Sequence, residues 1–310
     1  MRTRRQRGVA VVTAILVVAV AASAATYMLS QQSATLNQAA LVTARAQADA
    51  FAHAGLDWAR GILAEDARRT SVDSLAEGWA RPIAGLPVER AIVSGAIADA
   101  QGRLNLNNLV KDGRRSEADL QVFARLLQSL DLDPALAQAV LDWIDADADL
   151  AGPAGAEDPH YLALARPHRA ANQPLAQVEE LYRVRGFDAK AVERLRPHVA
   201  ALPARTTVNA NTASVEVLAA ILPELSRDEV RALAASRTAR PFPDKADFAS
   251  RAKKASPAAI EAHLDVRSSH FLVQVAVAQN DVQVATEALV SRGAAGASPP
   301  TAIIWRRAVY

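Results

Sequence analysis

The sequence has 310 residues, a formal net charge of +2 and no cysteine. Without cysteine the chain can form no disulfide bond and can use no thiol in catalysis, which excludes both kinds of chemistry. A net charge so close to zero gives no general indication of nucleic-acid binding. The length is sufficient for a folded part with a sizeable buried core.

An arginine-rich head and a long apolar run open the chain. Four arginines precede Gly8, and an uncharged run without glycine or proline continues from Val9 to Met28. At a helical rise of about 1.5 Å per residue, roughly twenty residues cross a hydrocarbon core of about 30 Å. Because the arginines all lie on one side of the run, we expect a single-pass chain with a cytoplasmic N-terminus and an exported remainder.

The helical pattern continues beyond the apolar run. From Leu36 to Ile62, apolar residues recur three or four positions apart and therefore share one face. We expect one long helix over residues 9–63, with residues 9–28 in lipid and the rest in water.

Three interpretations of the N-terminus predict different mature chains. A plain anchor keeps the leader, a signal peptide is cut after the small residues 22–24, and the third interpretation places the cut between Gly8 and Val9. A basic leader that ends in glycine, followed at once by an apolar helix that becomes amphipathic, resembles the type IV pilin and type II secretion pseudopilin family. The resemblance favours the third interpretation, since a signal peptide gives no reason for the uninterrupted helix behind it. It implies cleavage by a prepilin peptidase and methylation of Val9.

The fifth position of this mature chain departs from the pilin pattern. Pilins usually carry a glutamate there, whose carboxylate meets the N-terminal amine of a neighbouring subunit, but counting from Val9 the fifth residue is Thr13. A buried amine without a carboxylate partner is costly, so this chain is a poor repeated subunit of a filament. In lacking this glutamate, the chain resembles the large minor pseudopilin of type II secretion, the general secretion pathway protein K family. The resemblance implies a position at the filament tip.

Residues 70–86 contain glycine and proline among polar residues and predict a linking loop. Residues 91–109 predict two short strands joined by a turn at Gln101–Gly102. Within them the stretch DAQGRLNLN, Asp99–Asn107, resembles the matching stretch of the K family. Its glycine and asparagines are ordinary turn chemistry, so we expect no catalysis there.

A helical pattern begins near Arg115. Ser116 and Asp119 are expected to cap one helix, and Asp133–Pro134 to begin another whose apolar face runs to Ile144. Because strands flank this block, we expect an α-helical insertion within a β-containing domain, which is also what the resemblance to the K family implies.

The densest group of acids follows this second helix, within residues 142–161. Calcium takes six to eight oxygen ligands, which clustered carboxylates on a flexible loop can supply. The spacing begins like an EF-hand but has leucine at the sixth position, where glycine is needed, and alanine at the twelfth. A solvated helix end and loop is the alternative, although acids at a helix C-terminus oppose its dipole. The K family has a calcium site, so we expect a divalent-metal site, calcium in the first place, with these candidate ligands: Asp145, Asp147, Asp149, Glu157 and Asp158.

Histidines near these acids raise the alternative of zinc. His160 and His168 lie close by in the sequence, but the other histidines are scattered, whereas zinc sites need closely positioned nitrogen or sulfur ligands. We therefore expect hydrogen-bonded or surface histidines.

Two later segments, residues 178–202 and 209–237, each predict helix, short turn, helix. Asn211 and Ser226 are expected to cap the two helices of the second unit. Both units resemble helix-hairpin-helix modules, which grip nucleic-acid backbones in other proteins. The main rival function is therefore that of a membrane-anchored DNA-binding protein of a competence-type system.

The hairpins themselves argue against that rival. The hairpin at 223–225 carries Glu224 and no glycine, which removes close backbone approach and repels phosphate. Only the hairpin at 185–187 keeps the necessary glycine. We interpret both units as packing elements and expect no nucleic-acid partner.

The C-terminal part returns to strand character. Residues 270–278 and 282–292 predict two strands joined by a turn at 279–281, and residues 301–310 predict a last strand. A long helix on a C-terminal antiparallel sheet is the pilin architecture, so we expect an α+β, pilin-like fold. The expected segments are a leader at 1–8, the long helix at 9–63, the first part of the pilin-like domain at 64–110, the helical insertion at 111–265 and the C-terminal strands at 266–310.

The resemblance implies a non-enzymatic minor pseudopilin at the tip of a type II secretion pseudopilus. Such a protein is anchored in the bacterial inner membrane with its bulk in the periplasm. Its expected partners are the minor pseudopilins I and J, the major pseudopilin, the prepilin peptidase and the inner-membrane assembly platform.

Overall fold

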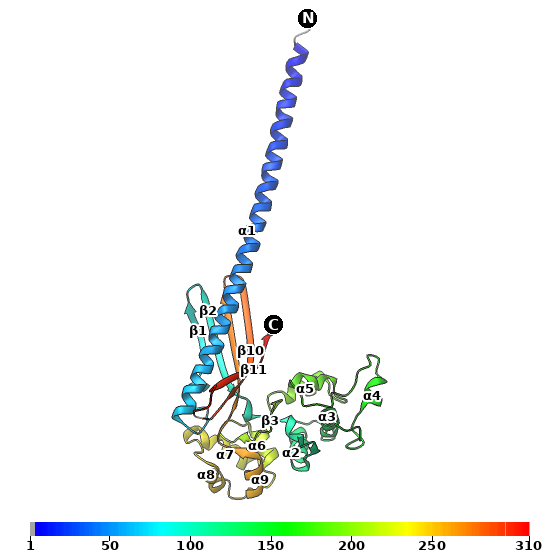
Figure 1. Ribbon diagram of the computed structural model, residues 1–310, viewed down its shortest axis with the longest axis vertical. Helices are drawn as coiled ribbons and strands as arrows, with labels where there is room; N and C mark the ends of the chain where they lie inside the picture. The colour runs from blue at the N-terminus through cyan, green and yellow to red at the C-terminus, as the bar shows by residue number, and fades with distance from the viewer. Residues whose placement is uncertain (1–3, 295, 310) are drawn as a thin grey trace.

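The computed structural model describes residues 4–294 and 296–309, and its first element is a single helix of 66 residues, α1 (Arg4–Arg69). Within the described residues, α1 alone is long and apolar enough to cross a membrane. Residues 9–43 are exposed throughout, and burial begins at Ala44. The N-terminal half of α1 projects alone from the folded part (Figure 1). The predicted continuous helix is confirmed, and it continues to Arg69 instead of ending at residue 63.

One face of a five-stranded antiparallel sheet packs against the second half of α1 (Figure 1). Every neighbouring pair of its strands is antiparallel. The strand order across the sheet is β1 (Ile83–Val88), β2 (Ala91–Asp99), β9 (His270–Gln279), β10 (Val282–Arg292) and β11 (Thr301–Val309).

Small residues set the distance between α1 and the sheet. The buried face of α1 is rich in alanine, and alternate residues of β9, including Val273 and Val275, face the helix. Gly55 marks the closest approach, because a Cβ added there would lie 2.8 Å from Cγ1 of Val275. The helix therefore lies directly on the strands, and both elements share one apolar layer.

The helical insertion lies between β2 and β9, which are far apart in sequence but adjacent in the sheet. It has its own apolar core and sits beyond the C-terminal end of α1 (Figure 1). Its α-helices are α2 (Glu117–Ser129), α3 (Leu136–Ile144), α4 (Asp158–Leu162), α5 (Ala189–Leu195), α6 (Val215–Ile221), α7 (Arg227–Ala239), α8 (Lys245–Arg251) and α9 (Pro257–His263).

Short strands and 3₁₀ turns connect these parts. The strand pairs are β3 (Leu104–Asn105) with β6 (Val199–Ala200) and β7 (Val208–Asn209) with β8 (Leu264–Asp265), both parallel, and β4 (Val110–Lys111) with β5 (Arg114–Arg115), antiparallel. The 3₁₀ turns are η1 (Gly78–Ala80), η2 (Ala100–Gly102), η3 (Leu106–Leu109) and η4 (Val178–Arg183). The predicted α+β, pilin-like fold with a helical insertion is confirmed.

The prediction of a loop over residues 70–86 is wrong at its end, because β1 begins at Ile83 and forms a hairpin with β2. Gly85 and Pro87 are typical of loops, so the sequence did not predict this strand. Gly85 adopts a positive φ of 67° where the register of the pair shifts, and Pro87 lies on an edge strand. Both residues are compatible with an irregular edge strand.

The second strand predicted within residues 91–109 does not return to the sheet. Gln101 and Gly102 form η2, through which the chain leaves the sheet toward the insertion. The following strand is only Leu104–Asn105, and it pairs with β6. The predicted turn therefore exists as a junction between two parts of the fold and not as a hairpin.

Helix ends in the insertion agree only in part with the predicted caps. Ser226 caps α7 in a capping box with Glu229, as predicted. Ser214, not Asn211, caps α6, and the side chain of Asn211 binds the backbone of Phe242 instead. In the first hairpin unit the expected leading helix is the 3₁₀ turn η4.

At the predicted start of α2, Ser116 occupies the N-cap position but makes no capping bond. Its hydroxyl donates to the Asp119 carboxylate at 2.6 Å.

The three C-terminal strands are confirmed. Residue 310, which was assigned to the last of them, lies outside the described residues.

Candidate functional site

The Asp99–Asn107 stretch is a buried polar junction between the sheet and the insertion. The Asp99 carboxylate accepts hydrogen bonds from the side chains of Asn209, Thr212 and Ser268 at 2.6–2.9 Å. Gln101 accepts from the backbone N–H of Ser269 at 2.7 Å. Gly102 leaves room for Thr212, since a Cβ added there would lie 2.8 Å from Oγ1 of Thr212.

The asparagines of the same stretch fix more distant loops. Asn105 accepts from the N–H of Leu202 at 3.0 Å, and Asn107 both accepts from the N–H of Leu175 and donates to its carbonyl. Because buried backbone groups need partners, these amides hold the segments at Leu175 and Leu202 in place. The stretch has a structural role that goes well beyond the turn chemistry expected from the sequence.

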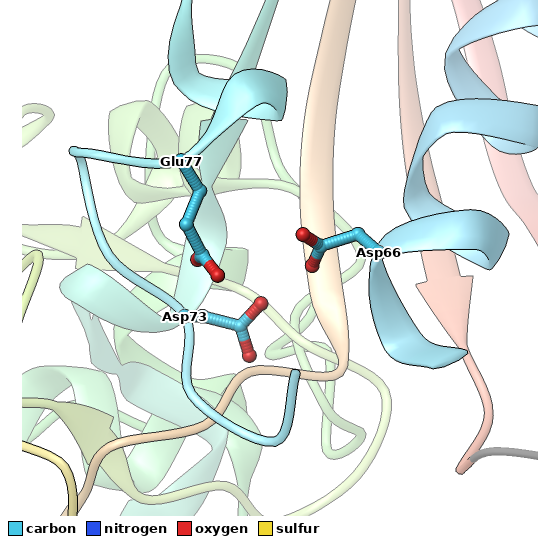
Figure 2. A group of neighbouring side chains, drawn as sticks. All are labelled: Asp66, Asp73 and Glu77. Carbon is cyan, nitrogen blue, oxygen red and sulfur yellow. The ribbon is translucent and has the colours of Figure 1, made fainter. Parts of the chain in front are cut away.

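Three acids meet where α1 ends. Figure 2 shows the carboxylates of Asp66, from the last turns of α1, and of Asp73 and Glu77, from the following loop, directed toward a common space. Their nearest oxygens lie within 4.8 Å of one another, a spacing compatible with a metal ion. Burial raises the pKa of Asp66 and of Glu77.

The guanidinium of Arg292 already binds two acids of this cluster. Arg292 donates to Asp66 at 2.8 Å, to Asp73 at 2.6 Å and to the carbonyl of Ser268 at 2.7 Å. Its side chain is only 8% exposed. The cluster is thus an internal ion-pair network that ties the end of α1 to β10, and it is a poorer metal candidate than its spacing suggests.

Replacing Arg292 by methionine should lower the free energy of unfolding by about 3–5 kcal/mol, because it leaves the buried carboxylate of Asp73 and the half-buried carboxylate of Asp66 without their cation. Urea denaturation of a fragment that starts at residue 30 measures this. Arg68→Met, near the same helix end but exposed, is the control and should change stability by less than about 0.5 kcal/mol. A loss below about 1 kcal/mol for Arg292→Met would contradict the assignment.

The acids predicted as metal ligands lie around the loop between α3 and α4. Asp145 directly follows α3 and Glu157 directly precedes α4, and they are only 7% and 4% exposed. Desolvation raises the pKa of Asp145 to about 6, with further contributions from Asp147 and Asp142. Desolvation and the neighbouring acids raise the pKa of Glu157 to about 7. Asp145 and Glu157 therefore share one negatively charged, poorly hydrated region.

Sequence reasoning missed a further acid of this region, Asp142. It lies on the buried side of α3, fully buried, three residues before Asp145. One of its oxygens accepts from the N–H of Ala151 at 2.8 Å. A Cβ added to Gly155 would overlap the other oxygen, so this glycine is needed for the loop to approach. The spacing of three, which places Asp142 and Asp145 on one helix face, was the available clue.

The remaining predicted ligands differ in position. Asp147 is exposed and accepts from the N–H of Asp149, which is exposed as well. Asp158 is half-buried and already accepts from the N–H of Ala170 at 3.0 Å. Asp142 and Asp145 thus lie near enough to Glu157 to raise its pKa, and Asp147 lies at the exposed side. Within the described residues the oxygens of these acids do not all lie within 4.8 Å of one another, as those of Asp66, Asp73 and Glu77 do, so the loop would have to close around a bound ion.

Unsatisfied oxygens make this region fit a hard cation. Asp142 Oδ2, Asp145 Oδ1 and Glu157 Oε1 are buried and have no hydrogen-bond partner among the described residues. Buried carboxylate oxygens normally have a partner. In addition, Asp142 raises the pKa of Asp145, and both raise the pKa of Glu157. Calcium coordination would satisfy such oxygens and offset the repulsion. The ring of His168 packs against Trp143 and Tyr161, and its Nε2 is likewise buried without a hydrogen-bond partner among the described residues.

The hairpin at 185–187, which has the glycine of a helix-hairpin-helix module, packs against α3. Gly186 has a positive φ of 84°, and a Cβ added there would collide with the Leu136 side chain of α3. At the next helix start, Asp188 caps α5 by accepting from the N–H of Ala191 at 2.7 Å. This carboxylate lies where a phosphate would have to bind, so the hairpin is unsuited to a nucleic-acid backbone.

Family models identify most of the insertion. Two models of "Type II secretion system (T2SS), protein K" match residues 102–204 and 208–267. Among the curated relatives, type II secretion system protein K of Pseudomonas aeruginosa is 35% identical over 79% of this chain and 76% of its own length. The protein of the same name from Aeromonas hydrophila is 30% identical over 94% of each chain.

Solved structures include one with the same architecture. A chain in the crystal structure of the GspK-GspI-GspJ complex from the type 2 secretion system of enterotoxigenic Escherichia coli superposes with a TM-score of 0.77 at 25% identity. The match covers 86% of this chain and 97% of that one, so it includes the sheet and the insertion.

Proposed function

The chain belongs to the type II secretion system protein K family and is a minor pseudopilin of type II secretion, and from this premise we propose that it forms the tip of the pseudopilus and helps to start its assembly. Its role is structural and not enzymatic. The single observation that carries the tip position is Thr13, which stands where a repeated subunit needs a carboxylate.

The geometry of Thr13 supports this proposal. Its hydroxyl donates to backbone carbonyls of its own helix, to Val9 and Ala10 at 3.0 Å. A hydroxyl used in this way cannot neutralise the N-terminal amine of a neighbouring subunit. The helix can therefore end a filament but is poorly suited to repeat within it.

Membrane anchoring and export follow from α1. Residues 9–43 are exposed, and the first twenty of them are uncharged and mostly apolar, so this part packs against no other part of the described chain. We propose that it spans the inner membrane once, with the arginines in the cytoplasm and the folded part in the periplasm. Cleavage between Gly8 and Val9 by a prepilin peptidase, with methylation of Val9, would release it for packing against other pseudopilins.

The proposed partners are other pseudopilins. The related structure is a complex whose title names GspK, GspI and GspJ, and we extend this association to the minor pseudopilins I and J that accompany the present chain. The major pseudopilin would follow below them, and the inner-membrane platform would drive assembly. No nucleic acid is needed for this role.

Calcium is the metal that best fits the acids between α3 and α4. Asp142, Asp145 and Glu157 would supply buried carboxylates and Asp147 an exposed one, with Asp158 near the rim. Bound calcium would neutralise their repulsion and hold the loop that connects the two helices. Its role would be structural, since the region lies in the insertion and carries no second group suited to catalysis among the described residues.

The initiation step can be tested in cells that overproduce the major pseudopilin. Without this chain, we expect at least tenfold fewer surface filaments per cell, because the step that starts each filament is lost. Thr13→Glu, which restores the carboxylate of a repeated subunit, should place the chain along the filament as well as at its end. Immunogold counting measures both quantities, and an unchanged number of filaments in the deletion strain would contradict initiation.

A further inference from the structure

Among the charged and amide side chains of the Asp99–Asn107 stretch, Arg103 alone makes no hydrogen bond within the described chain. The others bind within the chain, whereas Arg103 takes part in no hydrogen bond or ion pair among the described residues, although it is half-buried. Burial lowers the pKa of Arg103, and the charges of Glu287 and Asp99 only partly oppose this. None of its nitrogens is among the buried polar atoms without a partner, so the guanidinium reaches solvent. Its N–H groups are therefore free to bind a ligand that the chain does not supply.

A pocket surrounds the Arg103 side chain. Its volume is about 320 Å³, and it lies between the insertion and the face of the sheet that is turned away from α1. On β9, Leu272 and Gln274 line the pocket, whereas the alternating Val273 and Val275 pack on the helix side. The size is within the usual range for small-ligand sites.

Arg103 is the one arginine of this pocket that has no bonded carboxylate among the described residues. Arg307 donates to Glu287 at 2.8 Å and to Glu179 at 3.1 Å. Arg196 pairs with Glu193 at 3.0 Å and with Glu179 at 3.6 Å. The guanidinium of Arg103 is therefore free to take one carboxylate, whereas a dianion such as phosphate would meet the neighbouring glutamates.

The floor of the pocket is apolar. Leu289 belongs to a small cluster with Ala200 and Leu202, against which Leu272 and Trp305 pack. An anion bound at Arg103 would therefore be adjacent to an apolar surface that favours an attached hydrocarbon group.

We propose that this pocket binds a carboxylate attached to a branched or aromatic apolar group, with the guanidinium of Arg103 holding the carboxylate and Leu289 and Trp305 contacting the apolar part. A guanidinium suits this role because it binds a carboxylate through two parallel hydrogen bonds. The same chemistry occurs at the C-terminus of a peptide that ends in an apolar residue and in a free organic acid. The inference is independent of the proposed tip position.

Calorimetry with the full-length chain in a non-ionic detergent tests this proposal. The probes are N-acetyl-Gly-Leu with a free C-terminal carboxylate, the same peptide as its C-terminal amide, and 4-methylpentanoate. We expect the amide to bind at least tenfold more weakly than the free peptide. Binding of 4-methylpentanoate equal to that of the peptide identifies a free acid as sufficient, and binding of the peptide alone identifies a chain end; both results support the site.

Variants separate a binding role from a structural one. Arg103→Gln should weaken carboxylate binding at least tenfold without lowering the melting temperature, because the Arg103 side chain makes no hydrogen bond or ion pair among the described residues that the substitution could remove. Arg231→Gln, an exposed arginine on α7, should leave binding unchanged. If Arg103→Gln fails to fold, Arg103→Lys should bind the free peptide several-fold more weakly. Equal binding of peptide and amide, no binding of either acid, or wild-type affinity in the Arg103 variant would overturn the proposal.

Discussion

Replacing Gly8 by leucine should abolish processing of the N-terminus and with it all type II secretion that depends on this chain. The proposed cut lies between Gly8 and Val9, and a side chain at the last leader position would block entry into the peptidase. In the wild type, mass spectrometry of the membrane-extracted protein should find a mature chain that begins at methylated Val9. In Gly8→Leu it should find only the full-length form.

A matched variant distinguishes this from cleavage by a signal peptidase. Ala24→Leu changes the last small residue of the alternative site and should leave processing and secretion at the wild-type level. A mature chain that begins at Ala25, together with normal processing of Gly8→Leu, would contradict the pseudopilin interpretation of α1.

Calcium should raise the melting temperature of the folded part by roughly 5–15 °C. A ligand at 100 to 1,000 times its dissociation constant stabilises by about 2.7–4.1 kcal/mol, and each kcal/mol corresponds to about 2–4 °C for a domain of this size. Differential scanning calorimetry in calcium and in EDTA measures the shift on a fragment that starts at residue 30. That fragment keeps every buried residue of α1.

A substitution at this site should shift the melting temperature in opposite directions with and without calcium. In EDTA, Glu157→Gln should raise the melting temperature, because it removes one of several mutually repelling buried acids. In calcium, it should melt below the wild type, because a ligand is lost. Asp149→Asn, on the exposed part of the loop, is the control and should behave as wild type in both conditions. A variant that is destabilised equally with and without calcium would argue against a metal site.

Acidification should reduce the effect of calcium. The raised pKa values of Glu157, about 7, and Asp145, about 6, mean that the folded, metal-free chain holds protons more strongly than the unfolded chain. Its stability therefore falls as the pH rises through 6 and 7 and returns on acidification. The difference between the melting temperatures in calcium and in EDTA should shrink from pH 8 to pH 5.5.

Local patterns in the sequence predicted the long helix, the C-terminal hairpin and the insertion. The uninterrupted run behind Gly8 leaves little alternative to a helix, and the alternation in residues 270–292 is typical of strands with one buried face. In β1, Gly85 and Pro87 break the alternation, so the hairpin with β2 was not predicted. β1 is stabilised by its pairing with β2, and the local sequence of residues 83–88 does not show this pairing.

The spacing of acids in the sequence predicts a metal site in the loop between α3 and α4, and this stays a prediction. Which of the acids are buried could not be predicted, because the burial of Asp142 and Glu157 and the exposure of Asp149 depend on how α3 packs in the insertion. The polar residues of the Asp99–Asn107 stretch show the same limit. Their types are those of an ordinary turn, and only the tertiary structure brings Asn209 and Ser268, more than a hundred residues away, to Asp99.

Assembly with the minor pseudopilins I and J of the same secretion system tests the central claim most directly. Fragments of the three proteins without their membrane segments should be mixed at about 10 µM each, a concentration that detects associations stronger than about −7 kcal/mol. Size-exclusion chromatography with light scattering should then show one complex with a single copy of each chain. Elution of this chain as a separate monomer in the presence of both partners would contradict its assignment to the pseudopilus tip.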